Sequence, residues 1–492
     1  MSGIARRVFV ISDLHLGGVY AEPGSKGRGF RICTHAADVA GFIRKLAALP
    51  DSPAVELVIN GDLVDFLAEA EGTGWTPFTS DAAEAVTKFK AIVARDQVIF
   101  DALREYLARG HRLVLTLGNH DLELCFPAVR HALREIIGAG GAADFEFLHD
   151  GEAYQVGDAL IEHGNRYDVW NMVDYDALRH IRSLQSRGQP VPREQVFEPP
   201  AGSFMVAEVI NPIKKSYAFI DLLKPETGAT VPLVLALEPG YRGLLAKAAR
   251  FRFQGREHKL AAAAMPAFGG DISSSSGSTD FGSDISASGG QGEGDALDQE
   301  LRKVLGAESA GFISGVAQAG NGSSQIGSDI SSGLIERGLS FFGLLTAKAH
   351  SDYEKRIPLL YTAFQPLVKD ATFDPAVETA SEYLNAARDL AKNGIRHVVF
   401  GHTHMAKRIS LPSGGWYLNS GTWADVLQFP VEVLSGTREE SLAKLQQFAQ
   451  LMVTGDFSEW TTFRPTYVRL DLSENGTVAN AELIKYAESD SV

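Results

Sequence analysis

Residues 7–18 read RVFVISDLHLGG, which is a short apolar run followed at once by an aspartate and a histidine. The apolar run indicates a buried β-strand over residues 7–12, and the two glycines that follow allow the chain to turn tightly. Side chains two positions apart on an extended chain point to the same side, so Asp13 and His15 can both face one edge of a sheet. The segment therefore predicts a strand that ends in a pair of functional side chains.

Four more polar clusters stand at the ends of apolar runs elsewhere in the chain. They are Gly61-Asp62 after ELVIN, Gly118-Asn119-His120-Asp121 after RLVLTL, His163-Gly164-Asn165 at the end of two or three strands predicted over 145–163, and Gly401-His402-Thr403-His404 after HVVF. Ligands of open α/β sheets bind beyond the carboxyl ends of the strands, so clusters on separate strands can meet at one rim. The sequence therefore predicts an α/β core with one site assembled from five strand ends.

The α/β pattern covers only the two ends of the chain, which predicts one core split by an insertion. We predict the two parts of the core at residues 1–170 and 391–492, and a mainly helical insertion or cap at residues 171–390. Within the core, helical spacing predicts helices at 35–49 and 81–109. Asn475-Gly476 predicts a hairpin turn between strands at 467–472 and 481–486.

Residues 268–338 are rich in glycine, serine and aspartate and contain a loose repeat that reads GDISSSS, GSDISAS and GSDISSG. Such a composition buries too little apolar surface to offset chain entropy, so we predict a flexible segment. A plain linker is favoured over a calcium-binding repeat or a mobile lid, because the copies are few and irregularly spaced.

Composition disfavours several classes of protein. The 492 residues carry a formal net charge of -15, which disfavours general binding to nucleic acid or to anionic lipid. Cys33 and Cys125 form neither a disulfide framework nor a CxxC motif, which favours reduced thiols and a cytoplasmic location. We expect no transmembrane segment, because no uncharged apolar run reaches the roughly 20 residues that a membrane-spanning helix needs.

The chemistry of the clusters favours metal binding. Carboxylate, imidazole and amide groups are ligands of divalent transition metals such as manganese, iron and zinc, and the absence of cysteine argues against a zinc finger. Hydrolysis of phosphate esters is slow, and two metals about 3.5–4 Å apart clamp the phosphoryl oxygens and activate a water between them. Asp62 is the natural residue to bridge two such ions. The sequence therefore predicts two divalent metal ions at this rim.

The order of the five motifs, D-x-H, G-D, G-N-H-D, H and G-H-x-H, resembles that of the calcineurin-like metallophosphoesterases. The resemblance covers residues 7–168 and 395–422. It implies a β-sandwich flanked by helices and a dinuclear hydrolase of phosphate esters that uses a metal-bridging hydroxide. The implied ligands are Asp13, His15, Asp62 and His404 for one metal and Asp62, Asn119, His163 and His402 for the other. His120 would act as a general acid or donate to a phosphoryl oxygen, and Asp121 would orient His120.

Several further residues are candidates of lesser weight. Asn165, Arg166 and Tyr167 follow His163 closely and are predicted to bind the substrate, with a structural loop as the alternative. Asp65 could line the pocket, and a residue at the start of a helix is the equal alternative. Two lysines at 214–215 could grip an anionic group, although a solvated pair is favoured. The insertion follows directly after the fourth cluster, so we hypothesise that it caps the site and selects the substrate.

The substrate class stays open, and a phosphorylated small molecule and a phosphodiester are both candidates. The bond that is hydrolysed is that of a phosphomonoester, a phosphodiester or a pyrophosphate. A phosphoprotein phosphatase is disfavoured, because Phe66 stands where those enzymes carry arginine. The opening SDLHLG resembles that of the bacterial UDP-diacylglucosamine hydrolases, so a pyrophosphatase of that type is one alternative. Those enzymes usually carry arginine at the position of His120 and lack so long an insertion, which disfavours a lipid-sugar pyrophosphate as the substrate. A metal-dependent nuclease and a non-catalytic scaffold on the same fold are the remaining alternatives.

Overall fold

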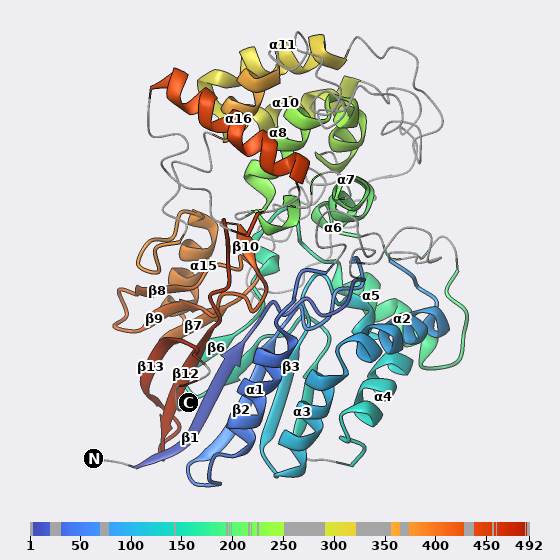
Figure 1. Cartoon of the computed structure of the whole chain (residues 1–492). Helices are drawn as coiled ribbons and strands as arrows, with labels where there is room; N and C mark the ends of the chain where they lie inside the picture. Colours follow the sequence, from blue (N-terminus) through green and yellow to red (C-terminus); the bar gives the residue numbers. More distant parts are fainter. Residues whose placement is uncertain are drawn as a thin grey trace, which may run out of the picture.

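Two β-sheets packed face to face form the lower part of the protein, with helices on their outer sides and a helical layer above (Figure 1). The computed structural model describes residues 3–19, 31–68, 78–141, 144–192, 195, 197, 199–214, 217, 219–223, 226–249, 291–320, 356–364, 373–427, 437–454, 457–458, 460–487 and 489.

The first sheet has six strands in the order β13-β12-β1-β2-β3-β4. They are β1 (Ile4–Ile11), β2 (Ala54–Asn60), β3 (Arg112–Thr116), β4 (Phe145–Leu148), β12 (Thr466–Ser473) and β13 (Val478–Lys485). β1 to β4 run parallel, whereas β12 is antiparallel to both of its neighbours. The predicted strands and the hairpin turn are confirmed, and Gly476 in that turn has a φ of 82° that favours glycine.

The second sheet has five strands in the order β5-β6-β7-β9-β8. They are β5 (Tyr154–Val156), β6 (Ala159–Ile161), β7 (His397–Phe400), β8 (Lys407–Ser410) and β9 (Trp416–Asn419). β6, β7 and β9 run parallel, so the chain leaves β6 and β7 at the same edge of the sheet. A separate pair joins β10 (Val426–Leu427) to β11 (Thr461–Thr462).

Alternating side chains of β1 explain why the two sheets pack together. Val8 and Val10 are completely buried and share a core with Ile161 and Val399 of the second sheet. Phe9, which lies between them in sequence, joins a different core under the flanking helices. A strand that is covered on both faces needs apolar side chains at successive positions, as Val8 to Ile11 provide. The predicted β-sandwich is therefore confirmed.

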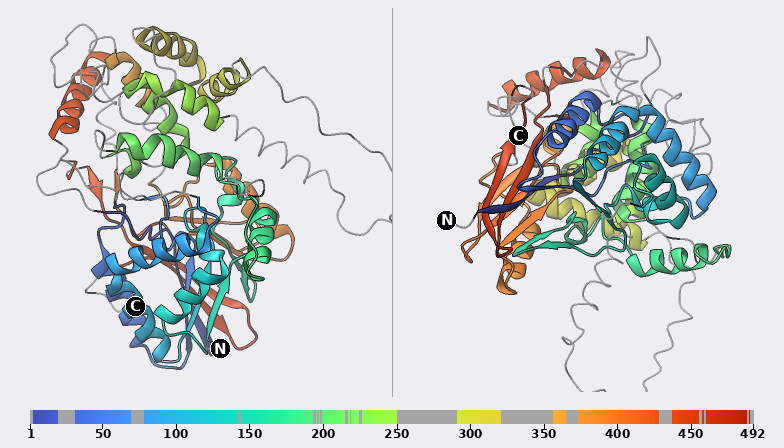
Figure 2. Two further views of the ribbon diagram at one scale, coloured as in Figure 1. Left: turned by 90° about the vertical axis from the view of Figure 1, so that its right-hand side faces the viewer. Right: turned by 90° about the horizontal axis from the view of Figure 1, so that it is seen from below.

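Helices cover both outer faces of the sandwich (Figure 2). Those that share the core on the outer face of the first sheet are α1 (Ala36–Ala47), α2 (Ala82–Arg95), α3 (Gln97–Ala108), α4 (Pro127–Ile136) and α5 (Tyr175–Gln185). On the outer face of the second sheet lies α15 (Ser381–Lys392). The helix predicted over residues 35–49 is confirmed by α1.

The single helix predicted over residues 81–109 is wrong, because the chain breaks at Asp96 into α2 and α3. The buried carboxylate of Asp96 accepts a hydrogen bond from the backbone N–H of Gly17 at 3.0 Å and also pairs with the guanidinium of Arg31. Both partners are distant in sequence, so helical periodicity could not reveal the break.

The helical layer has a hydrophobic core of its own, and we call it the cap; it comprises residues 199–364 and 437–460 where these are described. Its elements are α6 (Ala201–Met205), the π-helix η4 (Val206–Ile210), α7 (Asn211–Ile213), α8 (Glu226–Leu237), α10 (Gln291–Leu305), α11 (Ser309–Gly320) and α16 (Arg438–Thr454). Short 3-10 helices are η5 (Ile220–Leu222), η6 (Pro239–Tyr241) and η7 (Gly306–Glu308) in the cap, and η1 (Leu122–Cys125) and η2 (Asn165–Tyr167) in the sandwich. The predicted helical character of the insertion is confirmed.

The cap differs from the prediction in two respects. Leu445 and Phe448 of α16 pack into the core of the cap, although the sequence predicts that residues 391–492 belong to the sandwich. α10 and α11 lie inside the segment predicted to be flexible, because Leu297, Leu301 and Phe312 bury apolar side chains. The three copies of the repeat lie outside the described residues.

No helix in the described ranges combines the length and apolarity that a membrane crossing requires.

The cap contacts the loops that leave the first sheet. Oγ of Ser203 in α6 donates to the carbonyl oxygen of Asn119 at 3.4 Å, and Nδ2 of Asn211 in α7 donates to the carbonyl oxygen of Leu67 at 2.7 Å. The strand ends with the polar clusters therefore lie beneath the cap.

Candidate metal centre

The five polar clusters meet at one rim of the sandwich, as predicted. The converging side chains are Asp13 and His15 after β1, Asp62 after β2, Asn119 and His120 after β3, His163 after β6, and His402 and His404 after β7. All are buried except His402, which is partly buried. Since β1, β2 and β3 are parallel in one sheet and β6 and β7 in the other, their carboxyl ends place these side chains together.

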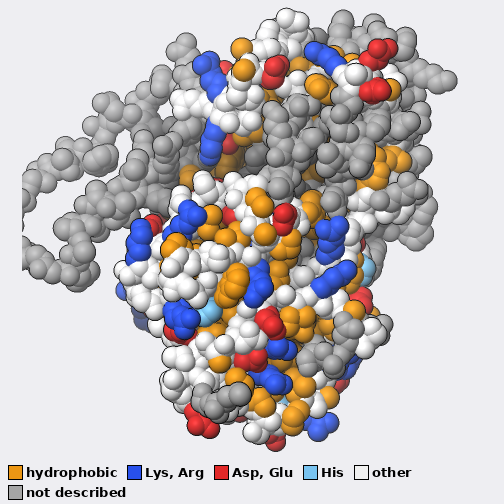
Figure 3. Space-filling view, turned by 90° about the vertical axis from the view of Figure 1, so that its left-hand side faces the viewer, with side chains coloured by type: hydrophobic (Ala, Val, Ile, Leu, Met, Phe, Trp, Pro, Cys, Tyr) orange, Lys and Arg blue, Asp and Glu red, His pale blue; other side chains and the backbone are white. Residues whose placement is uncertain are grey.

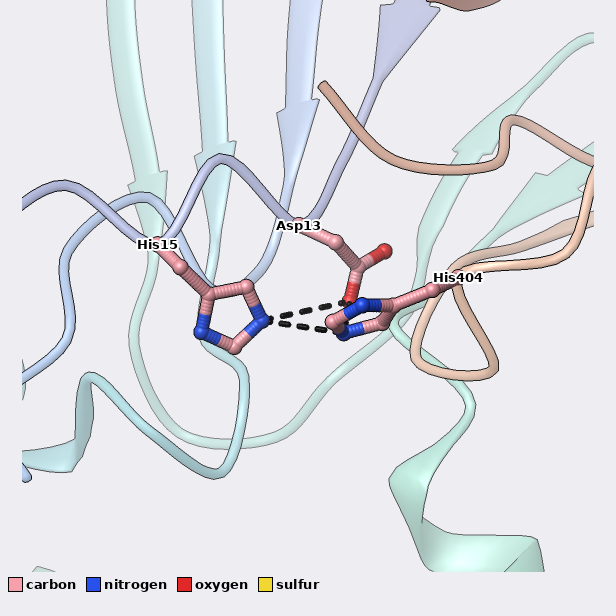
Figure 4. A group of neighbouring side chains, drawn as sticks. All are labelled: Asp13, His15 and His404. Carbon is pink, nitrogen blue, oxygen red and sulfur yellow. Dashed lines mark hydrogen bonds and ion pairs between the residues drawn. The ribbon is translucent and has the colours of Figure 1, made fainter. Parts of the chain in front are cut away.

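Asp13, His15 and His404 form the first group of ligand-type atoms, and their side chains point toward one another (Figure 4). Nε2 of His15 lies 3.0 Å from Nε2 of His404, which lies 3.4 Å from Oδ1 of Asp13. Oδ2 of Asp62 is 3.6 Å from Nε2 of His15. Ligand atoms about 2.0–2.2 Å from a metal ion stand about 3–3.5 Å from each other, so these separations fit a coordination shell.

Asp62, His163 and His402 form a second group, each with a ligand atom within 4.8 Å of the others. Oδ2 of Asp62 lies 3.2 Å from Nε2 of His163, and Nδ1 of His163 donates to the carbonyl oxygen of Asn60 at 2.9 Å. That bond places the proton on Nδ1 and leaves Nε2 as the electron-pair donor. The buried Oδ1 of Asn119 has no hydrogen-bond partner among the described residues. A buried acceptor without a partner is costly, and a cation would satisfy it.

Strained backbone marks the same residues. Among the described residues, six that are not glycine have a positive φ, and five of these are predicted metal ligands. The five are Asp13, His15, Asp62, His402 and His404, with φ between 45° and 65°. Left-handed backbone costs an L-residue about 1 kcal/mol or more and persists where surrounding contacts impose it, often at functional sites. The positive φ values at these five residues therefore support a functional role for the rim.

Gly61 and Gly118 directly precede the predicted ligands Asp62 and Asn119, and neighbouring atoms leave no space for a side chain at either glycine. A Cβ on Gly118 would lie 2.1 Å from Oδ1 of Asp62, and a Cβ on Gly61 would lie 2.4 Å from Nδ1 of His163. Gly61 also has a φ of 79°. The glycines of the G-D and G-N-H-D motifs therefore allow neighbouring loops to approach closely enough for the ligands to meet.

Electrostatics also favour a cation at this rim. Asp13 and Asp62 are both fully buried, and burial raises the pKa of Asp13 despite the opposing effect of His163. Burial also opposes ionisation of Asp62, but His163 and His120 hold the pKa of Asp62 below its usual range. Two buried carboxylates so close together repel each other when both are ionised. A divalent cation would relieve that repulsion.

Asp65 orients two of the histidines, a role that sequence analysis missed. Its Oδ2 lies 3.1 Å from Nδ1 of His15 and 3.1 Å from Nδ1 of His120. Burial would raise the pKa of Asp65, but the two rings hold it well below its usual range. Asp65 stands three residues after Asp62, and its position in the sequence indicates only a residue that lines the pocket.

The expectation that Asp121 orients His120 is corrected by the structure. The carboxylate of Asp121 accepts hydrogen bonds from the backbone N–H of Gly118 at 2.8 Å and from that of Leu63 at 2.9 Å. Asp121 therefore joins the loops after β2 and β3, and Asp65 takes the orienting role.

Replacing Asp65 with asparagine is expected to weaken metal binding and slow turnover together. The loss should be about 10- to 100-fold in each, because partners that orient metal-bound histidines typically contribute that much. Metal titration of the metal-free protein and kcat at saturating metal would measure the two effects. Asp176→Asn, an exposed position in the first turn of α5, is the matched control. Unchanged metal affinity and kcat in Asp65→Asn would contradict the orienting role.

The predicted substrate-binding residues lie at the entrance to the insertion and are engaged in contacts within the sandwich. Nδ2 of Asn165 donates to the carbonyl oxygen of Asn171 at 2.9 Å, and the guanidinium of Arg166 pairs with Glu162 at 2.9 Å. The hydroxyl of Tyr167 donates to Glu162 at 2.6 Å. Binding of the substrate by these three residues stays a prediction.

Asp168 is a further residue that supports the rim. Its Oδ2 lies 3.2 Å from Nε2 of His402 and accepts a hydrogen bond from Nδ2 of Asn171 at 2.7 Å. Oδ1 of Asn171 accepts a hydrogen bond from Nδ2 of Asn119 at 3.4 Å. This chain of contacts links the start of the insertion to two predicted ligands, Asn119 and His402. Lys214 is buried in the cap, and residue 215 lies outside the described residues.

Comparison with known proteins identifies the first part of the chain. Residues 6–203 match the family model described as calcineurin-like phosphoesterase, and the match runs from within β1 through β6 to the first residues of α6. Five predicted ligands fall inside the matched range, whereas His402 and His404 lie after it. No match was found among curated proteins or among solved structures. The resemblance stated from the motifs is therefore confirmed over residues 6–203.

Proposed function

The chain carries a calcineurin-like phosphoesterase domain, and we propose that this domain is a dinuclear metal-dependent hydrolase of phosphate esters. The observation that carries the proposal is the position of Asp62, which is within reach of His15 in the first group described above and of His163 in the second. Its Oδ2 lies 3.6 Å from Nε2 of His15 and 3.2 Å from Nε2 of His163. A carboxylate placed in this way can bind two cations at once, as two-metal hydrolases require.

The proposed metal sites share Asp62. The first consists of Asp13, His15, Asp62 and His404, and the second of Asp62, Asn119, His163 and His402. Oxygen and imidazole donors without thiolate fit manganese, iron or zinc. When bound, two such cations would stabilise charge on the phosphoryl oxygens and lower the pKa of the water between them.

His120 is the proposed proton donor to the leaving oxygen, or a hydrogen-bond donor to a phosphoryl oxygen. The centroid of its ring lies 4.7 Å from that of His15, in an edge-on arrangement, so it stands beside the first proposed site. Asp65 holds Nδ1 of His120 at 3.1 Å and thereby sets the orientation of the ring. The side chain is 8% exposed, which is compatible with contact to a bound substrate.

The proposed substrate is a phosphorylated small molecule or a phosphodiester, and the activity is that of a phosphatase or a phosphodiesterase. The net charge of -15 supports a small substrate over a nucleic-acid duplex. We also propose a cytoplasmic location, which two buried free cysteines support.

Metal analysis combined with an activity assay tests the proposed function. We expect about two equivalents of transition metal per chain, with turnover of p-nitrophenyl phosphate or bis(p-nitrophenyl) phosphate. A chelator should abolish turnover, and added manganese, iron or zinc should restore it. A fully metallated chain that hydrolyses no phosphomonoester, phosphodiester or pyrophosphate would contradict the proposal.

A further inference from the structure

A cleft of about 430 Å³ opens beside the first proposed metal site. His404 lines it at one end, next to Met405, and its other walls include Phe373, Leu483, Arg464 and Lys485. The volume lies in the range of about 300–1,000 Å³ that pockets for small molecules occupy. Because one of its lining residues is a proposed metal ligand, a molecule in this cleft would extend to the reacting phosphoryl group.

The chain builds the cleft from strand ends at the open side of the sandwich. Leu483 and Lys485 stand two positions apart on β13, so they share one face of that strand. Arg464 precedes β12, and its guanidinium lies 5.5 Å from the ring centroid of Phe373. Figure 3 shows the side of the molecule that carries β8, β9 and β13, where Lys and Arg side chains stand among hydrophobic ones.

The charge of the cleft is opposite to that of the chain. None of the described residues that line it is acidic, whereas two are cationic, in a chain with a net charge of -15. Two lining threonines use their hydroxyl groups internally: Oγ1 of Thr422 donates to the carbonyl oxygen of Asp13 at 2.7 Å, and Oγ1 of Thr466 donates to that of Ser420 at 2.6 Å. The two cationic residues that line the cleft are Arg464 and Lys485, and they give it its positive charge.

We propose that this cleft binds the organic part of the substrate, and that this part combines an apolar body with a second anionic group. The inference rests on the proposed function, since the phosphoryl group would lie at the metals. Phe373, Met405 and Leu483 offer apolar surface to the body, and Arg464 and Lys485 pair with a carboxylate or a second phosphate. The class of substrate is thus a phosphate ester or anhydride with an additional negative charge remote from the reacting phosphorus.

Two substrates that differ only in the remote charge test the inference: phenyl phosphate and 4-carboxyphenyl phosphate. For the double variant Arg464→Gln with Lys485→Met, we expect kcat/KM to fall about tenfold more for 4-carboxyphenyl phosphate than for phenyl phosphate. This expectation follows from the loss of two charge-assisted contacts that solvent partly screens. Lys392→Met removes one positive charge from an exposed position on α15 and should change neither value.

Binding of 4-carboxyphenyl phosphate, measured by calorimetry on the metallated full-length protein, separates failure of this inference from failure of the proposed function. If the wild-type protein turns over neither substrate, weaker binding by the double variant still supports the cleft, and equal binding overturns it. If turnover occurs and the double variant affects both substrates equally, the inference is wrong while the proposed function stands.

Discussion

Replacing Asp62 with asparagine is expected to lower kcat by about a thousandfold or more and to reduce the bound metal to less than one equivalent per chain. Oδ2 of Asp62 approaches Nε2 of both His15 and His163, and Oδ1 accepts a hydrogen bond from the backbone N–H of His120 at 2.8 Å. Asparagine keeps the size but loses the charge. If its oxygen still accepts from His120, its NH₂ group faces the two imidazoles, where a metal ligand is required.

Metal content after dialysis and kcat at saturating substrate would measure the effect of Asp62→Asn. Asp101→Asn, a partly exposed position on α3, is the matched control and should retain both. The melting temperature of the metal-free variant would show whether the fold survives. Two tightly bound metals with wild-type kcat in Asp62→Asn would contradict the proposed bridging role.

The site could be predicted from the sequence because its information is local. Each ligand stands within a few residues of the end of an apolar strand, and the strand itself is recognisable from its composition. Parallel strands then bring their carboxyl ends together whatever the length of the chain between them. This is why Asp13 and His404 could be placed at one rim from their strands, although most of the chain separates them. Their assignment to the same metal came from the resemblance to the calcineurin-like metallophosphoesterases.

Long-range contacts explain what the sequence could not predict. Asp96 interrupts a helical pattern because its carboxylate pairs with Gly17 and Arg31, and nothing in the local sequence signals those partners. Asp121 is adjacent to His120, yet its carboxylate binds backbone N–H groups, and Asp65 reaches the ring from another loop. Adjacency in the sequence therefore does not predict which carboxylate contacts which imidazole ring.

The position of α16 in the cap escaped prediction for a related reason. Its apolar residues, among them Leu445 and Phe448, indicate a helix that packs on something, but a pattern of spacing does not name the surface. The sequence predicts the insertion at 171–390 as one continuous excursion, whereas the chain returns to the cap after β10. The core of the cap is formed jointly by the insertion, which precedes β7 in the sequence, and by α16, which follows β10.

Replacing His120 with alanine is expected to leave both metals bound and to lower kcat by about 100-fold or more, the usual contribution of a positioned acid or base. His120 is not among the proposed ligands, so metal content should not change, in contrast to Asp62→Asn. If His120 protonates the leaving oxygen, the loss should be larger for phenyl phosphate than for p-nitrophenyl phosphate, because p-nitrophenolate leaves without a proton. If it only donates to a phosphoryl oxygen, the two losses should be equal.

His131→Ala is the matched control for His120→Ala, since His131 is an exposed histidine on α4 whose side chain is 75% exposed. Asp65→Asn should reproduce the same dependence on the leaving group to a smaller extent, because Asp65 holds Nδ1 of His120 at 3.1 Å. A His120→Ala variant with wild-type kcat on both esters would remove His120 from the chemistry. The metal centre alone would then have to account for turnover, and the contact between Asp65 and His120 would serve only to position the loop after β3.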